Sequence, residues 1–176
     1  MANLIVALAI SLPLAKPAFA RDCPQRIEQR EVRGDSLAGQ LNPGEAVKIA
    51  FGFYSCHDVQ REDIVAFAHP GDPAPIVKIV KGLPGDKFHL RQASGGWQIL
   101  INGYPAANSL KQPYLLSERG HKMLSLYEKD YKGVIPPNSY LILGNLAGGA
   151  LDSSRFGLIG KGDILGKVLR EKPAKS

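Results

Sequence analysis

Beyond residue 20 the chain is a succession of short apolar runs separated by turn-forming residues. In residues 45–51, the apolar Val47, Ile49 and Phe51 occupy every second position, the spacing of one face of a β-strand. Further runs rich in β-forming residues lie at 63–67, 75–80, 87–91, 97–101, 140–143 and 164–169. The Gly, Pro, Asn and Asp residues that turns require stand between them, at 42–44, 69–73, 83–86, 94–96 and 102–103. The pattern predicts an all-β or β-dominated domain.

One segment departs from this alternation. In residues 117–131, Met123, Leu124, Tyr127 and Tyr131 recur at helical spacing, and Gly133 follows as a stop signal. We therefore expect one helix here and short strands elsewhere.

The first 20 residues have the pattern of an export segment. Residues 1–15 carry no charged side chain, and Pro13, Lys16 and Pro17 interrupt the apolar run well short of the about 20 residues that span a bilayer. Residues 18–20, Ala-Phe-Ala, resemble the small-x-small site before signal-peptide cleavage. Two readings stay open, a cleaved signal peptide and a retained short membrane anchor, beside a third in which the segment is a buried helix of a cytosolic protein. We assign residues 1–20 to this segment, 21–171 to one β domain and 172–176 to a loose basic tail.

Composition narrows the class of protein. The 176 residues are 44% hydrophobic and 22% charged, and 19 Gly and 13 Pro are too many for a helical bundle. The net charge of +6 is spread thinly along the chain and suits an anionic membrane surface or an acidic partner. Without a block of like charges, we expect no nucleic-acid partner.

Two cysteines, Cys23 and Cys56, follow the export segment. An even count in an exported chain predicts a disulfide between them, and two unpaired core thiols are the alternative. The four histidines lack a second ligand at metal-motif spacing, apart from the single neighbour pair Cys56-His57, so we expect no metal and no cofactor.

Lys78 is the strongest candidate for a catalytic residue when the residues are considered by themselves. No Gly-x-Ser-x-Gly elbow is present, whereas strand alternation in residues 75–81 places Lys78 between Ile76 and Val80 on one face. Burial there disfavours the ammonium and lowers its pKa from about 10.4, leaving a neutral amine that can act as a base. Lys81 ends the strand and is expected to reach water. The plain alternative for Lys78 is a solvated lysine on an edge strand.

Four segments between residues 32 and 166 resemble the boxes of the signal peptidase I family, membrane-associated serine-lysine endopeptidases. Residues 32–37, Val-Arg-Gly-Asp-Ser-Leu, resemble its Val-x-Gly-x-Ser-Met box, and residues 61–65, Arg-Glu-Asp-Ile-Val, its Arg-Gly-Asp-Ile-Val box. Residues 78–86, Lys-Ile-Val-Lys-Gly-Leu-Pro-Gly-Asp, are similar to Lys-Arg-Val-Val-Gly-Leu-Pro-Gly-Asp and are the most specific match. Gly-Asn at 144–145 and Asp-Ser-Ser-Arg-Phe-Gly at 152–157 resemble the Gly-Asp-Asn and Asp-Ser-Arg-x-x-Gly elements.

This resemblance implies roles for particular residues. Ser36 becomes the nucleophile and Lys78 the general base, and the supporting positions, for the oxyanion or for orienting the dyad, are Gly34, Asp152, Ser153 and Arg155. The chain departs from the pattern at Leu37 in place of Met and at Gly39 in place of Pro. One extra residue before the arginine lets either Asp152 or Ser153 fill the family's Asp position, and we favour Asp152. The alternative for this last segment is a Gly-rich turn with a surface ion pair.

The resemblance also implies a fold and a function. The fold is an antiparallel β domain with at most one or two short helices. The activity is removal of signal or leader peptides from exported precursors with small residues at the first and third positions before the cut, as in members that mature pilin. The site would lie on the extracytoplasmic, periplasmic side of the cell membrane, or be soluble in the periplasm after signal cleavage. Two other classes stay open, a self-cleaving regulator with the same dyad and a noncatalytic exported β-domain that binds peptides.

Overall fold

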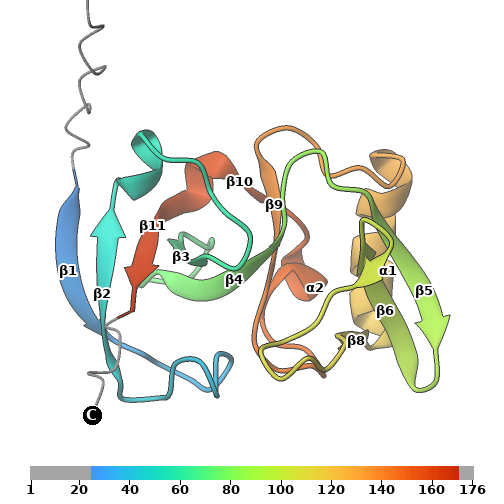
Figure 1. The fold of residues 1–176 in the computed structure, drawn as a ribbon, viewed down its shortest axis with the longest axis horizontal. Coiled ribbons are helices and arrows are strands. Elements are labelled where there is room, and N and C mark those ends of the chain that lie inside the picture. Colours follow the sequence, from blue (N-terminus) through green and yellow to red (C-terminus); the bar gives the residue numbers. More distant parts are fainter. Residues whose placement is uncertain (1–24, 171–176) are drawn as a thin grey trace, which may run out of the picture.

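A seven-stranded antiparallel sheet forms one half of the protein in the computed structural model, which describes residues 25–170 (Figure 1). Its strand order is β1-β2-β11-β3-β4-β9-β10. The strands are β1 (Arg26–Glu31), β2 (Ala46–Phe51), β3 (Ile64–Phe67), β4 (Ile76–Gly82), β9 (Ser139–Leu143), β10 (Ile159–Gly160) and β11 (Ile164–Leu169). Two 3-10 turns, η1 (Phe53–Ser55) and η2 (Lys161–Asp163), connect strands of this sheet.

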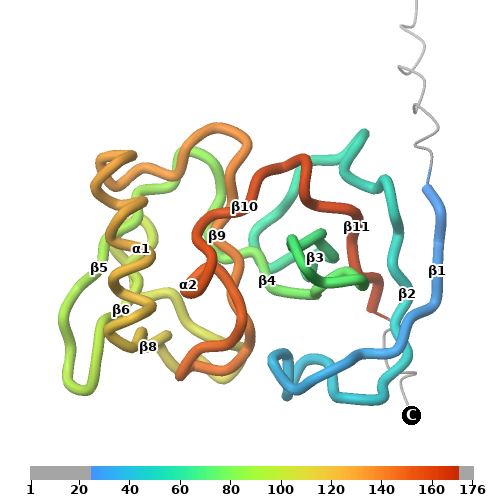
Figure 2. Tube along the Cα trace, turned by 180° about the vertical axis from the view of Figure 1, so that it is seen from behind, coloured from blue at the N-terminus to red at the C-terminus, as the bar shows by residue number. Residues whose placement is uncertain are grey.

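A smaller antiparallel sheet and a helix form the other half (Figure 2). Its strands are β5 (Phe88–Ala93), β6 (Gly96–Ile101), β7 (Tyr104–Pro105) and β8 (Leu115–Leu116), with β6 pairing to the other three. Helix α1 (Glu118–Asp130) packs along this sheet. The Ser117 side chain caps its N-terminus by accepting the Gly120 N–H, and Gly133, with φ of 69°, lies just past its end.

These elements confirm the predicted β-dominated class. Each of the seven predicted runs contains a strand, and the predicted helix is α1. Strand β1 was missed because its sequence, Arg-Ile-Glu-Gln-Arg-Glu, has one apolar residue and lies almost entirely exposed at a sheet edge. The second helix, α2 (Ser153–Phe156), spans only four residues, too short for a periodic signal.

Three clusters of buried side chains form the core of the protein. One fills the space between the smaller sheet and α1, and includes Phe88, Ile99, Tyr114 and Leu124. The other two belong to the larger sheet, one with Leu37, Ile49 and Ile79 and one with Val65, Phe67 and Val80. Strand β4 contributes to both of these clusters, so its backbone is held from two sides.

Strand β4 contains an irregularity that matters for the site. Val80 pairs with Ile142, but Gly82 pairs with Leu141, so Lys81 is an extra residue in the ladder. Gly82 fits there because an added Cβ would lie 2.4 Å from the Ile135 side chain and 2.9 Å from that of Leu141.

Several predictions concern residues beyond 25–170. The export segment, the basic tail and Cys23 lie there, so the disulfide between Cys23 and Cys56 stays a prediction. Within residues 25–170, no helix has the length and apolar character that crossing a membrane requires.

Candidate active site

The hydroxyl of Ser36 and the amine of Lys78 meet although 42 residues separate them. The Lys78 Nζ donates to the Ser36 Oγ over 2.8 Å. Ser36 lies in the loop between β1 and β2, and Lys78 lies in the middle of β4. Antiparallel pairing of β4 with β3 and β9 fixes the lysine backbone, while the loop brings the serine to it.

The Lys78 amine is buried with few polar partners. The residue is 3% exposed, and apart from Ser36 its Nζ donates to the Val77 carbonyl over 2.9 Å. Within residues 25–170, no carboxylate hydrogen-bonds to this amine. Desolvation therefore lowers the pKa of Lys78 below its ordinary value, and the more distant charge of Asp152 opposes this shift without cancelling it.

A tight turn presents Ser36 between two anchored residues. The Ala38 N–H donates to the Asp35 carbonyl over 2.8 Å, and Leu37 is 1% exposed in the core beside Val32. Ser36 itself is partly exposed. Among residues 25–170 no acceptor hydrogen-bonds to the Ser36 N–H, which leaves this donor available to a bound molecule.

Gly144 and Asn145 contact Ser36 through its main chain. The Asn145 N–H donates to the Ser36 carbonyl over 2.6 Å. A Cβ on Gly144 would lie 2.8 Å from the same Ser36 oxygen and 2.8 Å from the Ala150 Cβ, so only glycine allows this approach.

The predicted supporting residues separate into buried and exposed ones. Asp152 is 1% exposed, and its carboxylate accepts the Gly144 N–H over 2.9 Å and the Ser154 hydroxyl over 2.7 Å. Ser153 is fully buried and accepts the Ile142 N–H over 3.0 Å. Gly34, with φ of 73°, and Arg155 both lie exposed. Asp152 is therefore linked to the surroundings of Ser36 through Gly144, whereas Ser153 supports β9.

The expectation that Lys81 reaches water is wrong. Its side chain is 4% exposed, and its Nζ donates to both Glu62 carboxylate oxygens at 2.8 Å and to the Ala107 carbonyl at 2.8 Å. The amine also lies 5.7 Å from the centre of the Tyr114 ring. The bulge at Lys81 and the cover supplied by the segment around Ala107 explain the difference, since neither is visible in the alternation of one strand.

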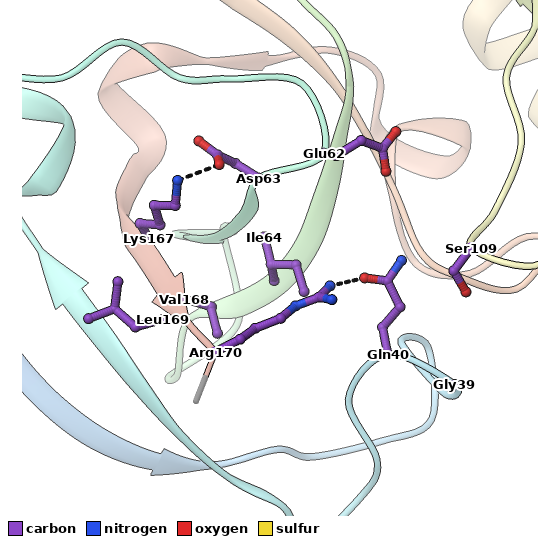
Figure 3. Close-up of a pocket in the computed structure, with 10 residues that line it drawn as sticks. All are labelled: Gly39, Gln40, Glu62, Asp63, Ile64, Ser109, Lys167, Val168, Leu169 and Arg170. Atoms are coloured by element: carbon purple, nitrogen blue, oxygen red, sulfur yellow. Dashed lines mark hydrogen bonds and ion pairs between the residues drawn. The ribbon is translucent and has the colours of Figure 1, made fainter. Parts of the chain in front are cut away.

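Two open clefts adjoin this region. One, of about 600 Å³, is lined on one wall by Gly39 and Gln40, and Figure 3 shows Gln40 bonded to Arg170 across it. The other, of about 500 Å³, lies over Lys81 and β7. Glu62 and Ser109 line both clefts. In the part of the chain described, no group of three or more His, Cys, Asp or Glu residues could hold a metal ion.

Sequence reasoning named Gly144 and Asn145 only as part of a motif and missed Ser109 and Tyr114. The Tyr114 hydroxyl donates to the Gly144 carbonyl over 2.6 Å, and Ser109 bonds to Asn145 through its N–H and hydroxyl. No local pattern marks these residues, because each acts through a partner about 30 or more positions away.

Comparison with known proteins identifies the family of this chain. The profile of the family described as "Signal peptidase, peptidase S26" matches residues 2–170. Signal peptidase IB of Staphylococcus aureus is 28% identical over 148 residues, covering 78% of this chain and 73% of the relative. Signal peptidase I of Bacillus caldolyticus is 29% identical over 140 residues, covering 78% and 74%.

Among solved structures, a signal peptidase I from Enterococcus faecalis aligns with 63% of this chain and 97% of its own, at 22% identity and a TM-score of 0.44. The family profile spans nearly the whole chain, so the resemblance found in the sequence is confirmed. The chain belongs to the signal peptidase family and is a serine-type endopeptidase.

Proposed function

We propose that this protein removes signal or leader peptides from exported precursors, with Ser36 as the nucleophile and Lys78 as the general base. The observation that carries the proposal is the 2.8 Å hydrogen bond between the Ser36 Oγ and the Nζ of Lys78, a residue that is 3% exposed. A lysine can accept a proton only when it is neutral, and burial without a bonded carboxylate favours that form.

In the acylation step, the neutral Lys78 amine takes the Ser36 hydroxyl proton while the Ser36 Oγ attacks the scissile carbonyl carbon. The tetrahedral intermediate collapses when the ammonium returns this proton to the leaving amine, and an ester links Ser36 to the leader peptide. Water then attacks the ester with Lys78 again as base, which restores both side chains.

The oxyanion of each tetrahedral intermediate needs hydrogen-bond donors. The free Ser36 N–H is the first such donor, and Gly34 supplies no side-chain hydroxyl. Asp152 acts at a distance, because its carboxylate binds the Gly144 N–H and its charge limits how far the Lys78 pKa falls.

Substrates are proposed to bind as extended segments with small residues at the first and third positions before the cut. Exposed residues 33–35 lie next to Ser36, so the surroundings of the serine are open to an extended peptide. The proposed site of action is the extracytoplasmic face of the membrane, where such precursors emerge.

A cleavage assay tests the proposal. The full-length protein is incubated with a precursor whose leader ends in Ala-x-Ala, and the new N-terminus is sequenced. Ser36→Ala should abolish the product, whereas Ser94→Ala, in the exposed β5–β6 turn, should leave it unchanged. A folded Ser36→Ala variant that cleaves at the wild-type rate would refute the assignment of the nucleophile.

A further inference from the structure

We infer that Asn145 is a positioning residue for catalysis, which clamps the Ser36 loop in the geometry that attack requires. The inference rests on the proposed function, since it concerns the same nucleophile. Asn145 follows β9, is 3% exposed, and contacts the loop from one side while Lys78 contacts the Ser36 hydroxyl.

The main chain of Asn145 makes the first contact. Its N–H donates to the Ser36 carbonyl over 2.6 Å, a bond that restrains the peptide group directly after the nucleophile. The preceding Gly144 is held on both sides, since Asp152 accepts its N–H and Tyr114 donates to its carbonyl. The donor that binds Ser36 therefore stands on a fixed peptide.

The side-chain amide makes four more contacts, which use its full hydrogen-bonding capacity. Its Nδ2 donates to the Ala38 carbonyl over 2.7 Å and to the Ser109 hydroxyl over 2.9 Å. Its Oδ1 accepts the Ser109 N–H over 3.0 Å and a Gln40 amide hydrogen over 3.4 Å. Asn145 thus bonds to three residues of the loop between β1 and β2, namely Ser36, Ala38 and Gln40.

Ser109 belongs to a second support, the strap formed by residues 106–113. Asn108 shapes the strap by accepting the N–H groups of Leu110 and Gln112, both at 3.0 Å, and donates to the Asn145 carbonyl over 3.0 Å. Lys81 ties the strap to β4 through the Ala107 carbonyl. Gln40 and Ser109 line the cleft drawn in Figure 3, so Asn145 joins both of these lining residues to the nucleophile.

An amide suits this position better than a carboxylate. Aspartate could not donate to the Ala38 carbonyl, and its charge would stand beside the turn whose serine contacts the Lys78 amine. A nearby negative charge stabilises an ammonium and so raises the pKa of Lys78. Aspartate would therefore harm catalysis twice, by loosening the turn and by holding the base in its protonated form.

The test measures steady-state cleavage of the Ala-x-Ala precursor, at varied substrate concentration and pH, for Asn145→Ala and Asn145→Asp. We expect kcat to fall about tenfold or more in both variants with KM changed by less than about threefold, since positioning acts on the reacting geometry. The acidic limb of the rate profile should move to higher pH in Asn145→Asp and stay in place in Asn145→Ala.

Asn138→Asp is the matched control. It adds the same charge at an exposed asparagine before the other end of β9 and should leave both kcat and the acidic limb unchanged. If an Asn145 variant fails to fold, Ser109→Ala removes one bond of the clamp, and a kcat loss of about twofold or more supports the inference.

Unchanged kcat in the folded variants, or a loss confined to KM, would overturn the inference. Failure of the proposed function looks different, because an active Ser36→Ala variant would show that another residue attacks the substrate.

Discussion

Two lysines of β4, three residues apart, are both almost fully buried, but their amines have different hydrogen-bond partners. Lys78 is 3% exposed and Lys81 is 5% exposed. The Lys78 amine bonds to a hydroxyl and a carbonyl, whereas the Lys81 amine bonds to both oxygens of the Glu62 carboxylate and to a carbonyl. The two lysines are thus buried alike, and what differs between them is the partner that meets the amine.

The surroundings of each amine explain this division. The acid closest in effect to Lys78 is Asp152, whose oxygens are occupied by Gly144 and Ser154. The acid beside Lys81 is Glu62, which reaches the amine from a backbone position with φ of 68°. A non-glycine residue in this conformation costs about 1–3 kcal/mol, so the fold retains Glu62 at some expense. The Lys78 amine therefore has no carboxylate bonded to it within residues 25–170, whereas the Lys81 amine is paired with one.

Removing the Lys78 amine should give the largest loss of activity among the variants considered. We expect Ser36→Ala, Lys78→Met and the double variant each to lose about a thousandfold or more in kcat, with no further loss in the double variant, because the pair acts as one unit. Lys78→Arg should fail as well, since guanidinium stays protonated. Steady-state cleavage rates measure this.

Lys81→Met is the control for that series and should retain activity within about threefold. An inactive Lys81→Met beside an active Lys78→Met would reverse the roles assigned to the two lysines.

Gly144→Ala should give the next largest loss of activity, because Gly144 contacts Ser36. The new methyl group would lie 2.8 Å from the Ser36 carbonyl oxygen, so the serine must shift relative to Lys78. We expect a loss of about tenfold or more in kcat, because small displacements of reacting groups are costly. Gly148→Ala, in the same loop with no atom within 4 Å of its added Cβ, is the matched control. Equal activity of the two variants would contradict the close packing at Gly144.

Changes to the Lys81–Glu62 pair should lower the stability of the protein rather than its cleavage rate. Glu62→Gln removes the carboxylate partner of Lys81, whose side chain is 4% exposed, and should lower the free energy of unfolding by about 1–3 kcal/mol. Lys81→Met should cost less than about 1 kcal/mol, because Glu62 is 57% exposed and returns to water. Urea denaturation of both variants measures the difference. A larger loss in Lys81→Met than in Glu62→Gln would mean that the carboxylate of Glu62, and not the amine of Lys81, is the group that needs a partner in the folded protein.

The smallest effect concerns the pH dependence of stability. The pKa of Lys78 is lower in the folded protein than in the unfolded chain, so the unfolded chain binds more protons between the two values and stability rises with pH there. Below the folded-state pKa the buried ammonium destabilises the fold in full. The stability advantage of Lys78→Met over wild type should therefore shrink as pH rises towards about 10.4. Urea titrations at several pH values test this, and a constant advantage would show that Lys78 titrates normally.

Much of this protein could be predicted from local sequence. Alternation and turn residues placed the seven main strands, and helical spacing with Ser117 and Gly133 placed α1, because these signals act within a few residues. The segment of residues 78–86 identified the family and named Lys78, since its chemistry depends on residue type and order.

Only the tertiary structure decided which residues meet Ser36 and Lys78 and which partners bind the Lys81 amine. Asn145 reaches Ser36 across more than 100 positions, and Lys81 finds Glu62 because a bulge and the 106–113 strap enclose it. Such contacts depend on where distant loops cross in space, and a hydrogen bond between them leaves no periodic trace in either segment. Local propensity sets the elements, whereas the partner of each buried polar group is set by the packing that surrounds it.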